Sequence, residues 1–379
     1  MIVDDSAVVR GLISRMVDGE ANFKVVASVG NGQMAVSNLQ RNPVDVIILD
    51  IEMPVMDGLT AIPKLLEVDP EVKIVMASTL TVHNAEISMK CLAAGACDTI
   101  AKPSSSREIS GGVDFRDLLL QKVRSLGEAR KKAGNRRGGG TAPARRVPFS
   151  RPGTTPASGT PASSPSPKPS LLSPTEPVKV RQPGRQKPEI LAIGSSTGGP
   201  QALFVFLKAL DKNIRVPIVI TQHMPKTFTT ILADHINRMT GWPCEEATDG
   251  MSLQPGRIAL APGDYHMTIE GSAASKTLRL NQDPPENFCR PAVDPMLRSV
   301  VNVYGGKAAV VILTGMGSDG CKGASKIVEA GGTVVAQDEE TSVVWGMPGA
   351  VAQAGLCSAV LALDDLAPYV NRLLGRGVA

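Results

Sequence analysis

Short apolar runs alternate with helical patterns through most of this 379-residue chain. In the first third, the helical patterns cover residues 6–18, 31–42, 58–68, 84–95 and 114–126. The apolar runs that precede or separate them end at Val3, Val29, Leu49, Ala77 and Ala101. Parallel strands need crossover connections, and helices are the usual ones. The sequence therefore predicts an α/β domain over residues 1–127, with a parallel sheet covered by helices on both faces.

The composition changes abruptly between residues 128 and 187. Pro, Gly, Ser, Thr and Arg dominate there, and large apolar residues are nearly absent. From Gly127 to Lys187 there are thirteen Lys and Arg but only two Glu, so this stretch carries +11 while the rest of the chain carries −7. Such a segment cannot bury enough apolar surface to offset its ordering entropy. We predict a disordered, self-repelling linker, in preference to a segment that binds nucleic acid or lipid.

The alternation resumes at Pro188 and continues to the C-terminus, so residues 188–379 are predicted to form a second doubly wound domain. A hairpin is expected around Gly271. The expected strands are 189–194, 216–221, 256–261, 308–313, 332–337 and 357–361, and the expected helices are 200–210, 227–239, 292–303, 319–330, 346–353 and 364–374.

Several classes of protein are disfavoured by composition. No run of about 18 apolar residues is present, so no membrane insertion is expected. The six cysteines show no Cys-x-x-Cys spacing, which fits reduced thiols and argues against a disulfide framework or a zinc site. The first residues resemble no export signal. No helix-turn-helix pattern follows the linker, so nucleic acid is not an expected partner. We expect a cytoplasmic protein.

Polar residues follow the predicted strands of the first domain. Asp4 and Asp5 follow the first strand and Asp50 ends the third, while Ser78 and Lys102 follow the fourth and fifth. The carboxyl ends of parallel strands meet at one edge of a sheet, where sites form. Carboxylates that converge there provide the hard oxygen ligands that suit Mg²⁺.

These residues resemble the receiver domain of two-component response regulators, and the segment Asp50 to Gly58 (Asp-Ile-Glu-Met-Pro-Val-Met-Asp-Gly) resembles it too. The resemblance implies a flavodoxin-like fold that is phosphorylated by a histidine kinase. Thr99 stands where many receivers have an aromatic switch residue. The implied roles are phosphoryl acceptor for Asp50, Mg²⁺ ligands for Asp4, Asp5, Asp50 and the backbone carbonyl of Glu52, and phosphoryl contacts for Ser78 and Lys102.

In the second domain, an apolar run from Ile190 ends in the turn Gly194-Ser-Ser-Thr-Gly-Gly199, before a helical pattern that starts at Pro200. A hydroxyl on a sharp strand-to-helix turn stands beside the free N–H groups of the helix. This is a suitable place for a nucleophilic serine, although a phosphate cradle or a plain turn has the same pattern. Ser196 is the candidate, and spacing alone leaves Ser195 as a rival.

Two further strand ends complete a candidate catalytic set. His223 follows the strand that ends at Thr221, and Asp319 lies in the loop after the strand that ends at Leu313. Serine needs a base, and imidazole titrates near neutrality. The imidazole in turn needs a carboxylate that fixes its tautomer. The order Ser, His, Asp differs from that of the α/β-hydrolases, and the triad is defined by geometry rather than by order.

A competing motif overlaps this set. Gly315-Met-Gly-Ser-Asp-Gly320 matches Gly-x-Gly-x-x-Gly between a strand and a helix, and Asp338 follows the next strand. That pattern is typical of dinucleotide binding. The alternative function is therefore a response regulator with a non-catalytic nucleotide-binding output domain. It would leave Ser196 and His223 unexplained, and it would place Asp319 beside a pyrophosphate of the same charge.

The chain as a whole resembles the bacterial chemotaxis protein-glutamate methylesterases, in which a receiver is tethered to a Rossmann-like esterase. The matching stretches are 193–199, 222–225, 258–264 with His266, 290–294, 313–320 and 346–349. The resemblance implies that Ser196 is the nucleophile, His223 the base and Asp319 the orienting carboxylate. The backbone N–H groups of Thr197 and Met316 would form the oxyanion hole.

The same resemblance implies a phosphorylation-activated esterase that converts glutamate γ-methyl esters on chemoreceptors to glutamate and methanol. Deamidation of glutamine is implied as well. The expected partners are methyl-accepting chemoreceptors, as substrate, and a chemotaxis histidine kinase, as phosphodonor. Mg²⁺ is expected at the receiver site and no cofactor is expected for ester hydrolysis. We expect a monomer.

Overall fold

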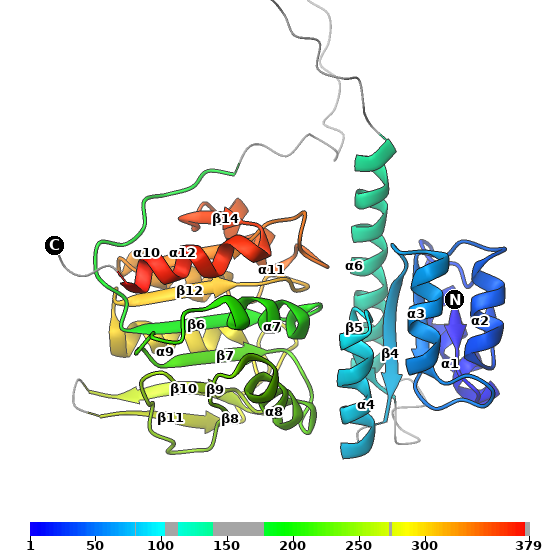
Figure 1. Cartoon of the computed structure of the whole chain (residues 1–379), viewed down its shortest axis with the longest axis horizontal. Coiled ribbons are helices and arrows are strands. Elements are labelled where there is room, and N and C mark those ends of the chain that lie inside the picture. Colours follow the sequence, from blue (N-terminus) through cyan, green and yellow to red (C-terminus); the bar gives the residue numbers. More distant parts are fainter. Residues whose placement is uncertain (80, 103–112, 139–177, 273–274, 376–379) are drawn as a thin grey trace, which may run out of the picture.

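The computed structural model describes residues 1–379 except 80, 103–112, 139–177, 273–274 and 376–379. It consists of two α/β domains that lie side by side (Figure 1). The helices α4 and α6 of the first domain are on the side that faces the second domain. The predicted fold class, two domains built on parallel sheets, is confirmed. None of the helices in the described part of the chain is long and apolar enough to cross a bilayer.

The first domain has a five-stranded parallel sheet in the order β2-β1-β3-β4-β5. Helices cover both of its faces, so the central strands are buried throughout. The order reverses between β1 and β3, and a site is expected at their carboxyl ends. The strands are β1 Ile2–Val3, β2 Ser28–Val29, β3 Val46–Asp50, β4 Lys73–Ser78 and β5 Asp98–Ala101. The helices are α1 Ala7–Asp18, α2 Gly32–Leu39, α3 Gly58–Val68, α4 Val82–Ala93 and α6 Val113–Gly138.

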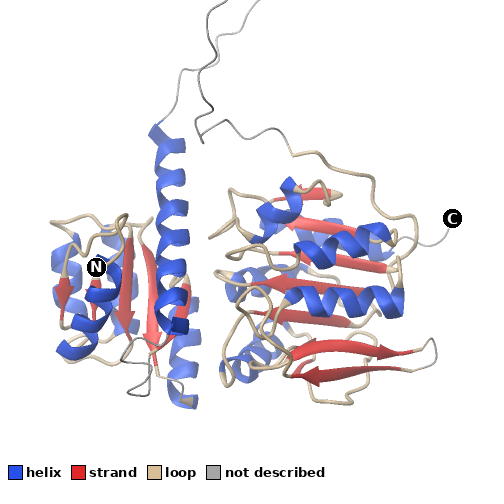
Figure 2. Ribbon diagram, turned by 180° about the vertical axis from the view of Figure 1, so that it is seen from behind, coloured by secondary structure: helices blue, strands red, loops and turns tan. Residues whose placement is uncertain are grey.

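The second domain has a seven-stranded parallel sheet in the order β14-β13-β12-β6-β7-β9-β8, with helices on both faces (Figure 2). The order reverses between β6 and β12, so the loops after β6, β7 and β12 gather at one edge. The strands are β6 Ile190–Ser195, β7 Ile218–Gln222, β8 Cys244–Glu246, β9 Ile258–Leu260, β12 Ala308–Ile312, β13 Thr333–Gln337 and β14 Ala359–Leu361. The expected hairpin is β10 His266–Gly271 with β11 Lys276–Asn281.

The helices of the second domain lie close to their predicted positions. They are α7 Gly199–Ala209, α8 Phe228–Thr240, α9 Val293–Tyr304, α10 Cys321–Glu329, α11 Met347–Gln353 and α12 Leu363–Gly375. The short edge strand β8 was not predicted, because its sequence Cys-Glu-Glu has no apolar alternation.

Helix α6 continues beyond the predicted linker boundary at residue 128. Residues 128–138 are helical, which corrects the prediction of disorder for this part. Glu128, Ala129 and Lys131 favour helix. Nη2 of Arg130 also lies 2.6 Å from Oδ2 of Asp69, which ties this part of the helix to the receiver. The compositional boundary therefore comes earlier in the chain than the structural one.

The other end of the predicted linker is held by the second domain. The N–H of Arg181 donates to the carbonyl of Cys357 at 2.9 Å, and the N–H of Gly184 donates to Oγ1 of Thr333 at 2.9 Å. A Cβ at Gly184 would lie 2.2 Å from the carbonyl oxygen of Gly331, so only glycine fits there. Residues 139–177, the middle of the predicted linker, lie outside the described residues.

Candidate active site

The turn after β6 is sharp because it contains residues without a side chain. Gly198 has φ +75°, a conformation that favours glycine. A Cβ at Gly199 would lie 2.0 Å from Oε1 of Gln222. The chain can therefore pass directly from the strand into α7, with Ser196 on the turn.

The two candidate serines have different environments. Ser195 is completely buried, and its Oγ donates to Oε1 of Gln222 at 2.7 Å. The Gln222 amide then donates to the carbonyls of Ser196 (2.9 Å) and His223 (3.2 Å), which fixes the turn against the end of β7. Ser196 is 5% exposed, and its Oγ has no hydrogen-bond partner among the described residues. Ser195 is engaged in the structure of the turn, whereas the hydroxyl of Ser196 is available.

His223 and Asp319 are brought together by the loops after β7 and β12. Nε2 of His223 lies 2.7 Å from Oδ2 of Asp319, and the histidine side chain is 10% exposed. The expected imidazole–carboxylate contact is therefore present. Because Nε2 faces the carboxylate, Nδ1 is the nitrogen left for a proton from serine.

The carboxylate of Asp319 is seated at the N-terminus of α9. Its oxygens accept backbone N–H bonds from Val293 (2.6 Å), Asp294 (3.1 Å) and Gly320 (2.9 Å), and a side-chain bond from Asn287 (3.0 Å). A helix N-terminus favours negative charge. Burial raises the pKa of Asp319. The contact with His223 and the bonds from the N–H groups of Val293 and Asp294 lower it by more than burial raises it, so the pKa lies below its ordinary value. The carboxylate is thus held in its ionised form.

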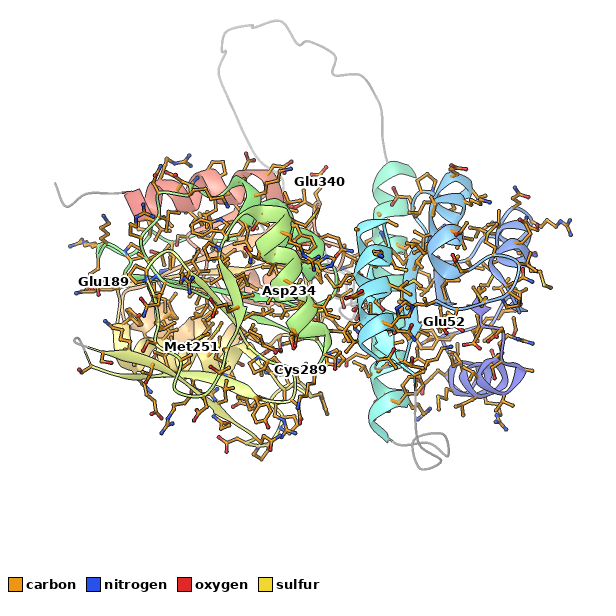
Figure 3. All side chains as sticks on the ribbon, turned by 60° about the horizontal axis from the view of Figure 1, so that its bottom comes forward. Glu52, Glu189, Asp234, Met251, Cys289 and Glu340 are labelled. Carbon is orange, nitrogen blue, oxygen red and sulfur yellow. The ribbon has the colours of Figure 1, made fainter. Side chains whose placement is uncertain are left out.

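Cys289 contacts the other nitrogen of the imidazole. Its Sγ lies 3.3 Å from Nδ1 of His223, and Figure 3 labels Cys289 among the side chains of this domain. Burial alone would lower the pKa of His223, but Cys289 and Asp319 favour the imidazolium and raise this pKa to about 10. We did not predict this contact, because a single cysteine four residues before the helix carries no recognisable sequence signal.

Two backbone N–H groups near Ser196 have no acceptor in the described part of the chain. They belong to Thr197 and Met316, the residues expected to form an oxyanion hole. Thr197 lies in the turn formed by residues 196–198, which carries the candidate nucleophile Ser196 and is called the nucleophile turn. Met316 lies in the loop after β12, and the N–H of Ser196 donates to the carbonyl of Thr314 in this loop at 3.0 Å. Free donors on both loops could receive a developing negative charge.

The glycine-rich loop has contacts that argue against a phosphate site. The N–H of Gly323, in the first turn of α10, donates to Oδ1 of Asp294 at 2.7 Å. The anion position of this helix is therefore taken by a carboxylate. Asp338 accepts two bonds from Thr341, at 2.9 and 2.7 Å, and is engaged in its own turn. These contacts oppose the dinucleotide-binding interpretation.

The first domain docks on the nucleophile turn of the second. The N–H of Gly198 donates to the carbonyl of Cys97 at 3.0 Å, and Nε2 of Gln201 donates to the carbonyls of Leu92 (3.1 Å) and Ala96 (2.6 Å). Oγ1 of Thr197 donates to Asp98, which Lys122 also contacts. Met316 packs against an apolar cluster made mainly of side chains from the first domain.

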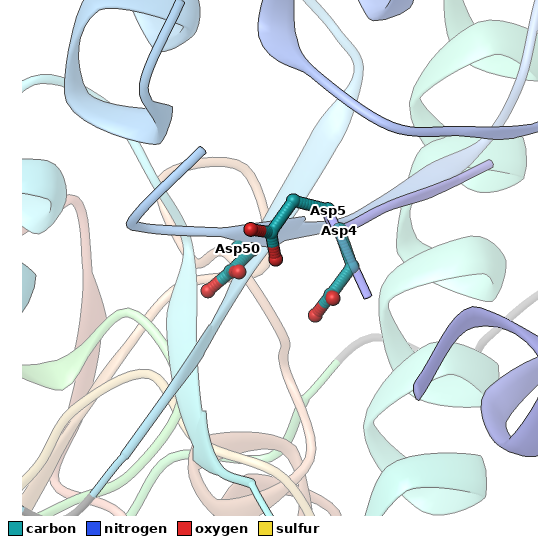
Figure 4. Close-up of side chains that lie close together, drawn as sticks. All are labelled: Asp4, Asp5 and Asp50. Atoms are coloured by element: carbon teal, nitrogen blue, oxygen red, sulfur yellow. The ribbon is translucent and has the colours of Figure 1, made fainter. Parts of the chain in front are cut away.

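The polar residues at the strand ends of the first domain also meet (Figure 4). Asp4, Asp5 and Asp50 each bring a carboxylate oxygen within 4.8 Å of the others. Nζ of Lys102 lies 2.7 Å from Asp4 and 2.7 Å from Asp50. Burial and the neighbouring Asp4 raise the pKa of Asp50, although Lys102 opposes the shift. Close carboxylates of this kind match the donor set of Mg²⁺, and the cation would relieve their repulsion.

The hydrogen bonds of the described residues do not join Ser78 or Glu52, the other predicted residues of this site, to the Asp50 side chain. Ser78 ends β4, and its hydroxyl donates to the carbonyl of Thr79 at 3.0 Å. Glu52 is exposed in the loop after β3 (Figure 3). A Cβ at Gly58 would lie 2.2 Å from the carbonyl oxygen of Asp50, so glycine is required where α3 begins beside this residue. The predicted roles of Ser78 and Glu52 stay predictions.

Together, the fold and the two sites define a response regulator whose output domain is a hydrolase. A family model of the response regulator receiver domain matches residues 1–114, and one of the CheB methylesterase matches residues 191–370. The chain belongs to the protein-glutamate methylesterase/protein-glutamine glutaminase family.

Full-length relatives support this assignment. The chain is 55% identical to protein-glutamate methylesterase/protein-glutamine glutaminase 1 of Paramagnetospirillum magneticum, over 99% of this chain and 96% of the relative. It is also 55% identical to the enzyme of the same family from Azospirillum brasilense, over 99% of this chain and 92% of the relative. Among solved structures, the Thermotoga maritima CheB methylesterase catalytic domain is 41% identical, covering 49% of this chain and 98% of that one, with a TM-score of 0.48.

Proposed function

We propose that this chain is a phosphorylation-activated serine esterase that removes methyl groups from glutamate γ-methyl esters on chemoreceptors, and that it deamidates receptor glutamines by the same path. The observation that carries the proposal is the contact of His223 with Asp319 close to a turn in which the Ser196 hydroxyl has no partner among the residues that the structure describes. The names of the full-length relatives supply the class of substrate.

In the first half of the reaction, Oγ of Ser196 attacks the ester carbon and Nδ1 of His223 takes its proton. The thiol of Cys289 must leave Nδ1 before this proton transfer, because one nitrogen cannot serve both groups. Asp319 stabilises the imidazolium that forms. The oxyanion is received by the N–H groups of Thr197 and Met316, and the loss of one such donor typically costs about 3 kcal/mol of transition-state stabilisation.

In the second half, the imidazolium donates its proton to the leaving methoxide, which departs as methanol and leaves an acyl-enzyme. The same imidazole then activates water, which attacks the acyl carbon. Collapse of the second tetrahedral intermediate releases the glutamate side chain and returns the proton to Ser196. An amide follows the same sequence with ammonia as the leaving group.

The proposal is tested by methanol release from a methylated chemoreceptor, followed by identification of the residue labelled by a fluorophosphonate. We expect methanol release and a single covalent adduct on Ser196. An adduct on Ser195 or Cys289, or hydrolysis that survives complete labelling of Ser196, would contradict the assignment of the nucleophile.

Strand β5 connects the phosphorylation site of the receiver with the candidate active site of the esterase, and this connection supports regulation by the receiver. Strand β5 begins at Asp98, which contacts Thr197 of the esterase, and is followed directly by Lys102, which is paired with Asp50. A phosphoryl group on Asp50 would draw Lys102 toward new anionic oxygens and so displace β5. The receiver then leaves the nucleophile turn, and the population shifts to an open esterase.

Removal of one docking contact tests this regulation. The Gln201 side chain gives two hydrogen bonds to the receiver and none to the described residues of the esterase. Two such bonds contribute about 1–3 kcal/mol, so Gln201→Ala is expected to raise methanol release by the unphosphorylated chain about tenfold. Gln353→Ala, at an exposed position of α11, is the matched control. If Gln201→Ala leaves basal activity unchanged while a phosphodonor still activates it, docking at this contact is not inhibitory.

The receiver chemistry is tested with acetyl phosphate as a small phosphodonor. Asp50 would be the acceptor, and Mg²⁺ bound by Asp4, Asp5 and Asp50 would neutralise charge on the transferred group. We expect intact mass spectrometry to detect one phosphoryl group on the wild-type chain. Asp50→Asn or chelation of the metal should abolish it. Asp57→Asn, at the cap of α3, is the control and should still be phosphorylated.

A further inference from the structure

The turn formed by residues 286–289 borders the catalytic set and has an unusual backbone. The N–H of Glu286 donates to the carbonyl of Cys289 at 3.1 Å, and the N–H of Cys289 donates back at 2.9 Å. The two central residues, Asn287 and Phe288, have φ values of +52° and +63°. Positive φ at both central positions is the pattern of a type I′ turn, for which Asn-Gly is the favoured sequence.

The turn is fixed by its contacts with the catalytic residues. Asn287 donates to Asp319 at 3.0 Å and to Asp294 at 3.2 Å, while Cys289 contacts His223. Arg298 holds the base of the turn through Glu286, with Nη1 2.9 Å from Oε2. The residues on either side of Phe288 thus face Asp319 and His223, and Phe288 itself projects into solvent.

Phe288 is 94% exposed, more than any other large apolar side chain in the described part of the chain. A non-glycine residue in the left-handed region costs about 1–2 kcal/mol, and an exposed ring gains no burial in return. Glycine would therefore suit this turn better than phenylalanine. The fold does not account for the ring, and exposed aromatic groups beside a site often anchor a partner.

We propose that Phe288 is a specificity-determining residue, which anchors an apolar side chain of the chemoreceptor next to the esterified glutamate. Because Asn287 contacts Asp319 and Cys289 contacts His223, a substrate whose ester group lies at these residues would place its adjacent side chains beside the ring. This inference rests on the proposed function.

The charges around the turn favour an apolar rather than an ionic contact. Glu286 is paired with Arg298, and Arg290 is paired with Asp264, with Nη2 2.7 Å from Oδ1. Glu286 and Arg290, the charged residues on the two sides of the ring, are thus each paired with a side chain outside the turn. The ring is also exposed while the receiver is docked, so it can contact the receptor before activation.

The test compares a methylated receptor with the γ-methyl ester of N-acetylglutamate amide, which lacks neighbouring residues, using the full-length phosphorylated chain. We expect Phe288→Gly to lower the ratio of receptor to small-ester kcat/KM about tenfold, mainly through a higher KM for the receptor. Phe288→Leu should keep most of this ratio. Val55→Gly is the matched control, because Val55 is also exposed, at 85%, with a φ of +69°.

The outcomes separate the two proposals. An unchanged ratio in Phe288→Gly, or the same loss in Val55→Gly, would overturn the role of Phe288 while receptor hydrolysis by the wild-type chain still supports the proposed function. Equal loss on both substrates would make Phe288 a structural residue of the site and would also overturn the inference. If the wild-type chain releases no methanol from the receptor, the proposed function fails and the inference falls with it.

Discussion

Replacing Ser196 with alanine is expected to lower ester hydrolysis by about 10⁴- to 10⁶-fold, as for other serine hydrolases that lose the nucleophile. Without Oγ there is no acyl-enzyme, and only the oxyanion donors and substrate binding act on water attack. The fold should be little affected, because this hydroxyl has no hydrogen-bond partner among the described residues. Initial rates of methanol release, with thermal unfolding measured in parallel, give the result.

Ser195→Ala is the control for this experiment. Its hydroxyl donates to Gln222, which holds the carbonyls of Ser196 and His223. The loss leaves a buried amide oxygen without its donor, at a cost of about 1–3 kcal/mol in stability. We therefore expect a lower Tm with a modest loss of rate. A larger loss of rate in Ser195→Ala than in Ser196→Ala would reverse the assignment of the nucleophile.

The strand ends that carry the candidate residues could be located from the sequence because of how parallel sheets are built. Strand ends could be located from apolar runs, and the carboxyl ends of such strands share one edge of a sheet. Ser196, His223 and Asp319 each follow a strand that lies beside another of the three, in the order β12-β6-β7. Their meeting at one edge follows from this topology, although they are far apart in the chain.

Other features depended on contacts that no local pattern contains. The choice between Ser195 and Ser196 required the position of Gln222, and the role of Cys289 required the orientation of an imidazole. Helix α6 extends past the compositional boundary, where Arg130 forms an ion pair with Asp69 of the receiver. The contact between β5 and the nucleophile turn joins Asp98 of one domain to Thr197 of the other. The spacing of residues along the sequence carries no information about such a contact between domains.

Asp319→Asn should lower ester hydrolysis by about 10⁴-fold, because it reverses the tautomer of His223. All the groups that contact the two oxygens of Asp319 donate hydrogen bonds, among them the N–H groups of Val293, Asp294 and Gly320. In asparagine an NH₂ group replaces one of the two oxygens, so it must face one of the groups that now donate to Asp319. If it faces Nε2 of His223, that nitrogen becomes an acceptor, the proton moves to Nδ1, and Nδ1 can no longer take the serine proton.

The pH profile distinguishes this effect from a general loss of structure. Only the neutral imidazole accepts the serine proton, so wild-type hydrolysis should rise with pH through the pKa of His223, which the contact with Asp319 raises. Loss of the carboxylate lowers this pKa, so the rise in Asp319→Asn moves to lower pH. Asp294→Asn is the matched control, since Asp294 caps α10 through Gly323 and does not contact His223. Equal losses of rate and unchanged profiles in both variants would show that Asp319 acts only through the fold.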